Sequence, residues 1–563
     1  MFLRTSRQKL GGGGCIEHYQ LAESVWDKQS KRSKTRIVYN FGRVDDPEVV
    51  ERLRKLACSI LRRCAPEELA GEVAGVRLVD AWPFGDQFVL DALWQRLGVD
   101  AIIRSLSGSR RLSFSVERAI FAMVANRALA PCSKLYCYEQ WLREDVKIPG
   151  TEALELQHLY RAMDFLEANK EALEKAIYFS VADLVHIDVD LIFYDTTSLH
   201  FEIDEEDEGV GEQQLVRGSR AAGGKQYPAP RKRGYAKNGR GDAPQIVVGL
   251  AVTRDGLPVR HWVFPGNTVD VTTVQRVKED LRGWKLGRCV FVGDAGMVSA
   301  ENRRTLSLGG GKYILCMPWT PGGEVTEDVV TRAGRYSDVA ENLRVKEVVV
   351  GDGERRRRYV VCFNPEEAQR QRKHREKLLA HLEAEVASLS DLDASHYTKR
   401  VFELVASRRY GRYLRRTSTG KLRINYEAVS RAAKHDGKFV VHSNDDTLTA
   451  EDLALGYKQL MRVEQAWRQL KSGLRMRPVF HWAPHRIHAH VFLTVIALLL
   501  ERLAERACGD TWRNIRDDLQ QIKLAQLSGP NGTIWQVTDA RPDARSRLKL
   551  LDIKNLPTIL DHA

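Results

Sequence analysis

The sequence lacks the cysteine patterns of a zinc module. Its 563 residues hold nine cysteines without a Cys-x-x-Cys pair. The two closest pairings, Cys58 with Cys64 and Cys132 with Cys137, match no common zinc spacing. We therefore expect reduced, mostly buried thiols in a cytoplasmic protein.

Long apolar runs are also absent. The longest, residues 491–500, has half of the roughly 20 residues that a helix needs to cross a bilayer. Residues 1–10 carry charge but no apolar stretch of signal-peptide length. These features predict a soluble protein that is not exported.

Acidic residues are fewer than basic ones. There are 74 Asp and Glu against 87 Lys and Arg, which gives a formal net charge of +13 and a pI near 9.2. The excess favours a polyanionic partner such as DNA, although both signs are interspersed along the chain. The length suggests about three or four domains.

One acid stands inside an apolar run. Residues 191–201, Leu-Ile-Phe-Tyr-Asp-Thr-Thr-Ser-Leu-His-Phe, contain no Gly or Pro and predict a buried strand with Asp195 in its middle. Burying an unpaired carboxylate costs several kcal/mol or more. Asp195 therefore requires a compensating partner, and we expect a divalent metal ion.

Two further acids occupy positions that suit such a site. Asp294 follows the short apolar strand 289–293 and precedes Gly296, and acids at the carboxyl ends of buried strands commonly line the sites of α/β sheets. Residues 449–472 predict a helix in which Tyr457, Glu464 and Lys471 recur every seven residues and so share a face. An ordinary solvated face with an ion pair is the alternative for that helix.

Three carboxylates of this kind can hold two divalent cations for in-line displacement at a phosphodiester. Oxygen ligands alone favour Mg²⁺, with Mn²⁺ as a substitute. Asp195, Asp294 and Glu464 are the candidate catalytic and metal-binding residues. The alternatives are a structure-specific nuclease, a DNA-binding protein without catalysis, and a glycosidase that uses Asp195 and Asp294 as its carboxylate pair.

The pattern along the chain predicts a mixed α/β protein with six regions. These are a β-hairpin region (1–45), a helical domain (46–185), the first part of the catalytic core (186–318), an inserted mixed α/β subdomain (319–445), the final core helix (446–480) and a helical C-terminal region (481–563). Binding of DNA ends by the helical domain is implied only by the family resemblance described below. Within the insertion, the arginine clusters 355–358 and 408–416 are either DNA-facing or merely solvated.

Several segments together resemble the DDE transposases of bacterial and archaeal insertion sequences, in the IS-four-like superfamily. The resemblance spans about residues 15–505 and is closest to the branch with a long insertion between the second Asp and the Glu. The segments that carry it are Tyr194-Asp195-Thr-Thr-Ser-Leu, Val292-Gly293-Asp294-Ala-Gly296, Tyr457 with Glu464 and Lys471, Gly234-Tyr-Ala-Lys237, Pro244-Gln-Ile-Val247, Val263-Phe-Pro-Gly-Asn267, Leu474-Arg-Met-Arg-Pro478 and His481-Trp482.

This resemblance implies a ribonuclease-H-like catalytic domain, two Mg²⁺ ions held by the three acids, cleavage at the terminal inverted repeats, and transfer of the 3′-hydroxyl ends to target DNA. It also implies a homodimer on paired ends, in a prokaryotic cytoplasm near the nucleoid. The implied DNA contacts are Tyr457, Lys471, Arg468, Arg475, Arg477 and Lys237. The family's signature Arg is absent, because position 460 is Leu, and Arg468 is the candidate to replace its charge.

Overall fold

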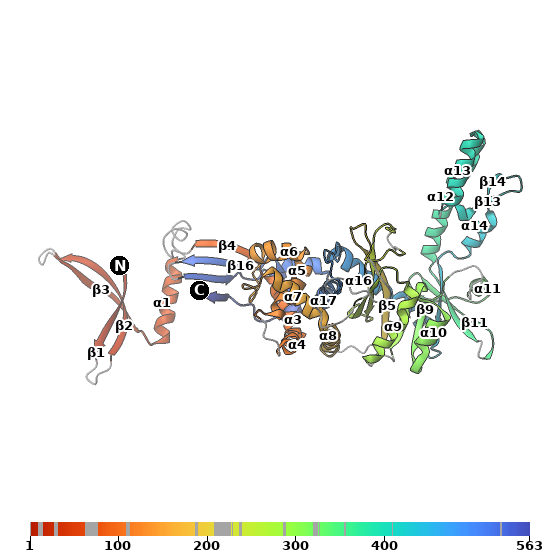
Figure 1. The fold of residues 1–563 in the computed structure, drawn as a ribbon. Coiled ribbons are helices and arrows are strands. Elements are labelled where there is room, and N and C mark those ends of the chain that lie inside the picture. The colour runs from red at the N-terminus through yellow and green to blue at the C-terminus, as the bar shows by residue number, and fades with distance from the viewer. Residues whose placement is uncertain are drawn as a thin grey trace. The chain divides into compact units, whose positions relative to one another are not determined.

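The computed structural model describes residues 2–9, 15–27, 32–61, 77–108, 113–185, 190–207, 227, 229–235, 239–284, 286, 289–318, 325, 327–353, 356–407, 409–529 and 532–562. The chain forms two compact units (Figure 1). The smaller unit consists of residues 1–81, 524–539 and 557–563, and the larger consists of residues 82–523 and 540–556.

The smaller unit begins with a three-stranded antiparallel sheet of β1 (Phe2–Lys9), β2 (Cys15–Asp27) and β3 (Arg32–Arg43). The pairing of β2 with β3 confirms the predicted hairpin, and β1 adds a strand that was not expected. The helix α1 (Pro47–Leu61) begins where Asp46 accepts a hydrogen bond from the Glu48 amide, with Pro47 at its first position.

A second sheet contradicts part of two predictions, which made regions 46–185 and 481–563 helical. Strands β4 (Arg77–Pro83), β16 (Lys523–Gly529), β17 (Gly532–Val537) and β18 (Ile559–His562) lie in the order β18-β17-β16-β4. Regions 46–185 and 481–563 are therefore not wholly helical. These strands are short, and β4 pairs with a segment more than 400 residues away. Local periodicity carries no signal for such a pairing.

The larger unit contains a helical bundle built from two distant segments. It includes α3 (Gly85–Arg96), α4 (Val99–Ser107), α5 (Val116–Leu129), α6 (Lys134–Tyr136), the π-helix η1 (Cys137–Asp145), α7 (Leu156–Ala168), α8 (Lys170–Val185), α17 (Pro484–Cys508), α18 (Trp512–Leu519) and α19 (Pro542–Leu550). Helix α17 packs against α5 and α7. It is long and apolar enough to cross a bilayer, yet 89% of its most apolar window is buried inside the protein. It is therefore the central helix of the bundle.

A nine-stranded mixed sheet is the second main part of the larger unit. Its order is β10 (Ser337–Ala340), β11 (Leu343–Val350), β12 (Arg357–Phe363), β15 (Lys438–Ser443), β9 (Lys312–Cys316), β8 (Val290–Gly293), β5 (Leu191–His200), β6 (Gln245–Val252) and β7 (Pro258–Pro265). Strand β8 is parallel to both β5 and β9, and the other pairs are antiparallel. The strands predicted at 191–201, 245–252, 259–264, 289–293 and 313–317 are confirmed within a few residues.

The predicted insertion subdomain needs correction. Strands β10, β11, β12 and β15 extend the main sheet, because β15 pairs with β9. Their valine-rich runs, such as Val360–Val361 and Val440–Val441, are fully buried, as expected for interior strands. The segment between β12 and β15 has a hydrophobic cluster made up of its own residues.

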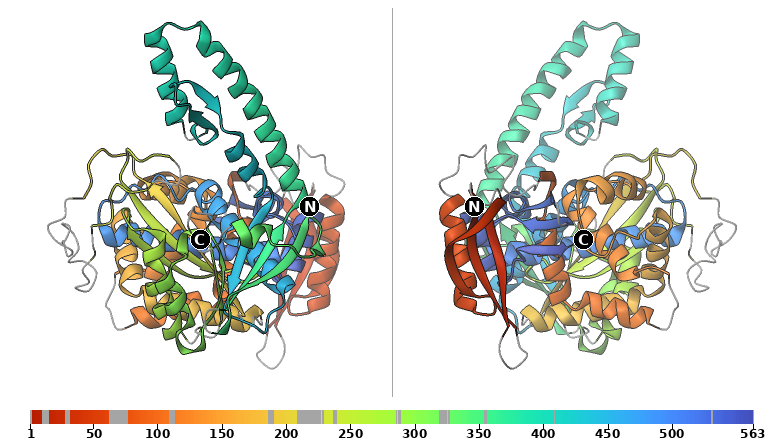
Figure 2. Two further views of the ribbon diagram at one scale, coloured as in Figure 1. Left: turned by 90° about the vertical axis from the view of Figure 1, so that its right-hand side faces the viewer. Right: turned by 90° about the vertical axis from the view of Figure 1, so that its left-hand side faces the viewer.

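That separate segment contains α12 (Pro365–Ser388), the 3-10 turns η6 (Leu389–Asp391) and η7 (Gly411–Tyr413), α13 (Ala394–Ala406), β13 (Leu414–Arg416), β14 (Leu422–Ile424) and α14 (Tyr426–Ala433). Figure 2 shows α12 and α13 as neighbouring long helices that extend away from the sheet. Leu378 and Leu382 of α12 pack with Val401 and Leu404 of α13.

The two faces of the main sheet carry different helices. Ile192 and Tyr194 of β5 pack in one cluster with Val274 and Val277 of α9 (Asp270–Gly283), and α10 (Ala300–Ser307) packs against α9. We call this side the α9 face. Leu191 alternates with Ile192 and meets Gly456 of α15 (Ala450–Lys458). The side that carries α15 and α16 (Met461–Arg468) is called the α15 face.

The prediction of a single helix over residues 449–472 is wrong. The segment is divided into α15, α16 and the π-helix η8 (Gln469–Gly473). Between α15 and α16 the amides of Leu460, Arg462 and Val463 bond to carbonyls three residues back, which tightens the turn. Helix α15 packs against β9 and β15, whereas α16 packs against β5 and β6. Helices α15 and α16 thus follow different strands of a twisted sheet. For this reason the seven-residue spacing does not align Tyr457, Glu464 and Lys471 along one helix face.

Candidate active site

Asp195 lies at the centre of the sheet. It is the half-buried position within a strand that is otherwise buried up to Leu199. Side chains alternate along a strand, so Asp195 shares the α15 face with Leu191, whereas its neighbour Thr196 points to the α9 face. There the Thr196 hydroxyl donates a hydrogen bond to Asp270 Oδ1 at 2.5 Å. The fold therefore directs the Asp195 carboxylate toward α15 and α16.

Asp294 is the first residue after β8 and is exposed. Phe193 pairs with Val292 in the parallel register of β5 and β8, so the same register places Asp195 beside Asp294. Paired strands lie about 4.8 Å apart, and side chains at paired positions share a face. That register, continued by two residues, puts Asp195 and Asp294 at neighbouring positions on the α15 face.

Tyr457 joins this pair from α15. Its hydroxyl donates a hydrogen bond to Asp294 Oδ1 at 3.3 Å. Burial raises the pKa of Tyr457 far above its usual value, and the nearby Cys316 thiol and Asp294 carboxylate raise it further. The hydroxyl consequently keeps its proton and remains a donor to Asp294 at every ordinary pH.

Glu464 lies on α16 and is exposed, while Val463 and Ala466 on the same helix are buried. Because α16 packs against β5 and β6, Glu464 belongs to the helix layer above Asp195. Across the described ranges, no group of three or more His, Cys, Asp or Glu has the spacing to hold a metal ion. The structure thus pairs two of the predicted acids and places the third on an adjacent helix, outside a closed three-acid cluster.

The predicted DNA contacts are distributed over the same region. Lys471 is half-buried in η8. Arg468 is exposed and lines a cavity of about 250 Å³ with Arg502 and Trp512, whereas Leu460, at the position of the signature Arg, is buried. Lys237 lies outside the described residues.

The two remaining arginines follow η8. Arg475 is exposed with a positive φ of 44°, and its carbonyl accepts a hydrogen bond from Arg127 Nη1 at 3.1 Å. Arg477 Nη1 lies 3.5 Å from Nδ1 of His200 at the end of β5. Arg477 is thereby placed at the end of the strand that carries Asp195.

Asp270 is a structural contributor that the sequence analysis missed. Besides accepting from Thr196, its Oδ2 lies 3.4 Å from where a Cβ at Gly296 would stand. Asp270 therefore lies between β5 and the turn that follows Asp294. Its only sequence signal is an acid in the first turn of a predicted helix, which is ordinarily explained by the helix dipole.

Two family models match the chain. Residues 213–500 match the family described as the transposase DDE domain, and residues 3–70 match the N-terminal domain of the IS1634 family transposases. The first span includes Asp294 and Glu464 and begins after Asp195. No curated protein matches the chain significantly.

Three solved structures are distantly similar. The piggyBac transposase synaptic complex with hairpin DNA is 10% identical over 78% of this chain and 80% of that one, with a TM-score of 0.32. The Mos1 paired-end complex with the left transposon end is 13% identical over 40% and 56%, with a TM-score of 0.13. The Mos1 mariner paired-end complex with Mn is 13% identical over 48% and 68%, with a TM-score of 0.14.

Because the transposase DDE domain covers half of its length, the chain belongs to that family, whose members use divalent metal ions. It is a DNA transposase of the insertion-sequence type.

Proposed function

We propose that this transposase cleaves DNA at the terminal inverted repeats of its element and transfers the freed 3′-hydroxyl ends to target DNA, with Asp195, Asp294 and Glu464 as its catalytic acids. The observation that supports the proposal is the parallel register of β5 and β8, which leads, two residues further on, to neighbouring positions for Asp195 and Asp294 on one face. Paired carboxylates in a sheet are costly without a cation, and the +13 chain suits a DNA substrate.

We assign the sheet that carries Asp195 and Asp294 to a ribonuclease-H-like domain. Strands β5, β6 and β7 form an antiparallel meander, and β8 and β9 continue the sheet beside β5 in parallel, with α9 in the connection from β7 to β8. That order supports a ribonuclease-H-like assignment for residues 191–316. The later strands β15, β12, β11 and β10 are an extension of that core.

The donor set fits a hard divalent cation. Asp195 and Asp294 offer carboxylate oxygens, which Mg²⁺ and Mn²⁺ prefer, and Glu464 supplies a third from α16. When bound, two such ions would activate the attacking hydroxyl and stabilise the leaving oxygen. Tyr457 holds the Asp294 carboxylate in place through its hydroxyl, and Arg477 at the end of β5 binds a phosphate of the DNA end. Two copies of the chain act together on paired ends.

A cleavage assay tests this function. Full-length protein is incubated with a labelled duplex that carries the element end, with Mg²⁺ or with EDTA, and with a second duplex as target. We expect end-specific cleavage and joined products with Mg²⁺ and neither with EDTA, because uncompensated carboxylates cannot stabilise the transition state. Robust cutting in EDTA contradicts the proposal, and metal-dependent cutting without joined products reassigns the chain to a nuclease.

Removal of the Tyr457 hydroxyl gives a smaller effect. Tyr457→Phe loses a hydrogen bond to a charged group, worth about 1.5 kcal/mol or more, so we expect a cleavage rate roughly tenfold lower at saturating DNA. The matched control is Tyr426→Phe, whose hydroxyl donates to Glu383 at 3.0 Å outside the site. Equal rates for the two variants would show that the contact with Asp294 has no role in cleavage.

A further inference from the structure

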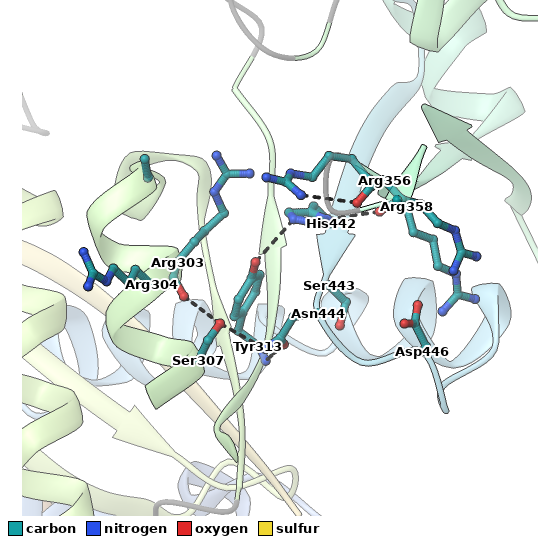
Figure 3. A pocket seen from close by; sticks show the side chains of 13 residues that line it. Arg303, Arg304, Ser307, Tyr313, Arg356, Arg358, His442, Ser443, Asn444 and Asp446 are labelled. Carbon is teal, nitrogen blue, oxygen red and sulfur yellow. Dashed lines mark hydrogen bonds between the residues drawn. The ribbon is translucent and has the colours of Figure 1, made fainter. Parts of the chain in front are cut away.

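A basic cavity opens on the α9 face, away from the acids. It has a volume of about 520 Å³ and lies between α10 and the strands β12 and β15 (Figure 3). Among the residues that the structure describes, its lining contains one acid, Asp446, and five arginines, which are Arg303, Arg304, Arg356, Arg357 and Arg358. From the sequence, the arginines of 355–358 are either DNA-facing or merely solvated. The fold joins those that the structure describes to two arginines of α10, and this excess of positive charge favours a polyanion.

The floor of the cavity is rigid. His442 and Tyr313 are both buried, and the Tyr313 hydroxyl lies 3.3 Å from His442 Nε2. His442 Nδ1 donates to the Arg358 carbonyl at 3.0 Å. Arg358 in turn donates from Nη1 to the Leu448 carbonyl at 2.8 Å and from Nη2 to Glu347 at 3.0 Å. These bonds fix β12 against β15 and hold the rim in place.

The rim of the cavity carries exposed positive charges that a ligand can contact. Arg304 and Arg356 are exposed, and neither forms an ion pair with a residue that the structure describes. Figure 3 shows Arg303 reaching from α10 over Tyr313 toward the β12 side. Guanidinium groups on opposite sides of an open cavity match the spaced phosphates of a backbone, which arginine binds through paired hydrogen bonds.

This cavity is separate from the catalytic acids. Tyr313 belongs to the buried cluster of the α9 face, whereas Asp195 and Asp294 point to the α15 face. Tyr313 also pairs with Phe291, three residues before Asp294, which is roughly 10 Å back along the strand. A phosphate in the cavity is therefore not the one that the acids attack.

We propose that the arginine cavity is a second DNA-backbone site, which binds phosphates of a duplex at a distance from the scissile one. The inference rests on the chain being a DNA transposase, since that gives the polyanion its identity. A free nucleotide is the other source of the same phosphate chemistry. Duplex DNA is favoured because the described lining offers no exposed aromatic ring on which a base could stack.

A binding experiment with a matched pair of variants tests this site. Arg304→Ala/Arg356→Ala removes two rim charges of the full-length chain. Arg344→Ala/Arg372→Ala removes two exposed charges elsewhere, each paired with an acid, Asp338 or Glu376. Fluorescence anisotropy measures the affinity for a labelled duplex that lacks the element end, across a series of salt concentrations. ATP is added as a competitor in the same assay. Thermal melting checks that both variants are folded.

We expect the rim variant to bind the duplex roughly 100-fold more weakly, about tenfold for each lost charge-assisted contact. Its salt slope falls by about 2, about 1 for each phosphate contact, while the control stays near wild type. Cleavage at saturating DNA stays at the wild-type rate. Affinity and slope equal to those of the control overturn the proposal, as does loss of ATP binding with unchanged duplex binding. If the wild-type protein does not cleave DNA, the proposed reaction is refuted. The salt slopes of duplex binding still test whether the arginine cavity binds DNA.

Discussion

Asp195→Asn and Asp294→Asn each reduce cleavage of end-bearing DNA at least about a thousandfold, because removing one carboxylate from a metal site forfeits several kcal/mol of transition-state stabilisation. Both substitutions preserve side-chain size, so the sheet is expected to stay folded. Duplex affinity without metal stays at the wild-type value or rises slightly, because a negative charge is lost near the DNA.

The control for these variants is Asp183→Asn. Asp183 is exposed on α8, and its substitution removes the same charge from the same unit. Single-turnover cleavage and anisotropy on all three proteins separate chemistry from binding. If Asp195→Asn cleaves at the rate of Asp183→Asn, the assignment of Asp195 fails, even though its strand is placed as predicted.

Glu501→Gln stabilises the protein at alkaline pH. Glu501 of α17 is buried, which raises its pKa to about 8, although the Gln469 amide donates a hydrogen bond to it at 2.7 Å. Since the unfolded pKa is near 4.5, the folded state binds the proton more tightly. This contribution to stability is full below pH 4.5 and is lost as the pH rises through about 8.

Between pH 5 and pH 8 the wild type therefore loses roughly 3 kcal/mol of unfolding free energy that the glutamine variant keeps. Glutamine still accepts the hydrogen bond from Gln469, so the packing is retained. Urea denaturation at both pH values, with the exposed Glu171→Gln as control, measures the difference. A parallel pH dependence for wild type and Glu501→Gln would contradict the raised pKa.

The sequence predicted the parts of the fold whose signals are local. The runs around Asp195 and Asp294 are short, apolar and bounded by turn residues, and a buried strand needs little more to be recognised. The register that sets the two acids side by side was not visible. It depends on a parallel pairing between segments about 100 residues apart, which local periodicity does not encode.

The predictions that failed share a different cause, which is non-local packing. Residues 319–445 were assigned to a separate subdomain because their short strands and charged helix interrupt the pattern of the main sheet, yet β15 pairs with β9 of that sheet. The helix at 449–472 was predicted as one rod because its apolar stripe is regular. The tightened turn at Leu460 appears only because α15 and α16 pack against different strands.

The candidate site was likewise predictable in composition but not in spacing. Asp195 was chosen for the cost of burying its charge, Asp294 for its place at a strand end, and Glu464 for its place on a helix face. In the structure the Tyr457 hydroxyl contacts Asp294. Glu464 sits on a helix whose packing the sequence did not specify.

Manganese binding followed by electron paramagnetic resonance tests the central claim most directly. Wild-type protein with end-bearing DNA is titrated with Mn²⁺, beside Asp195→Asn, Asp294→Asn, Glu464→Gln and the Asp183→Asn control. We predict two bound ions per chain in the wild type and the control, and loss of at least one ion in each of the other three variants. Wild-type Mn²⁺ affinity and stoichiometry in Asp195→Asn and Asp294→Asn would contradict a metal site at these acids.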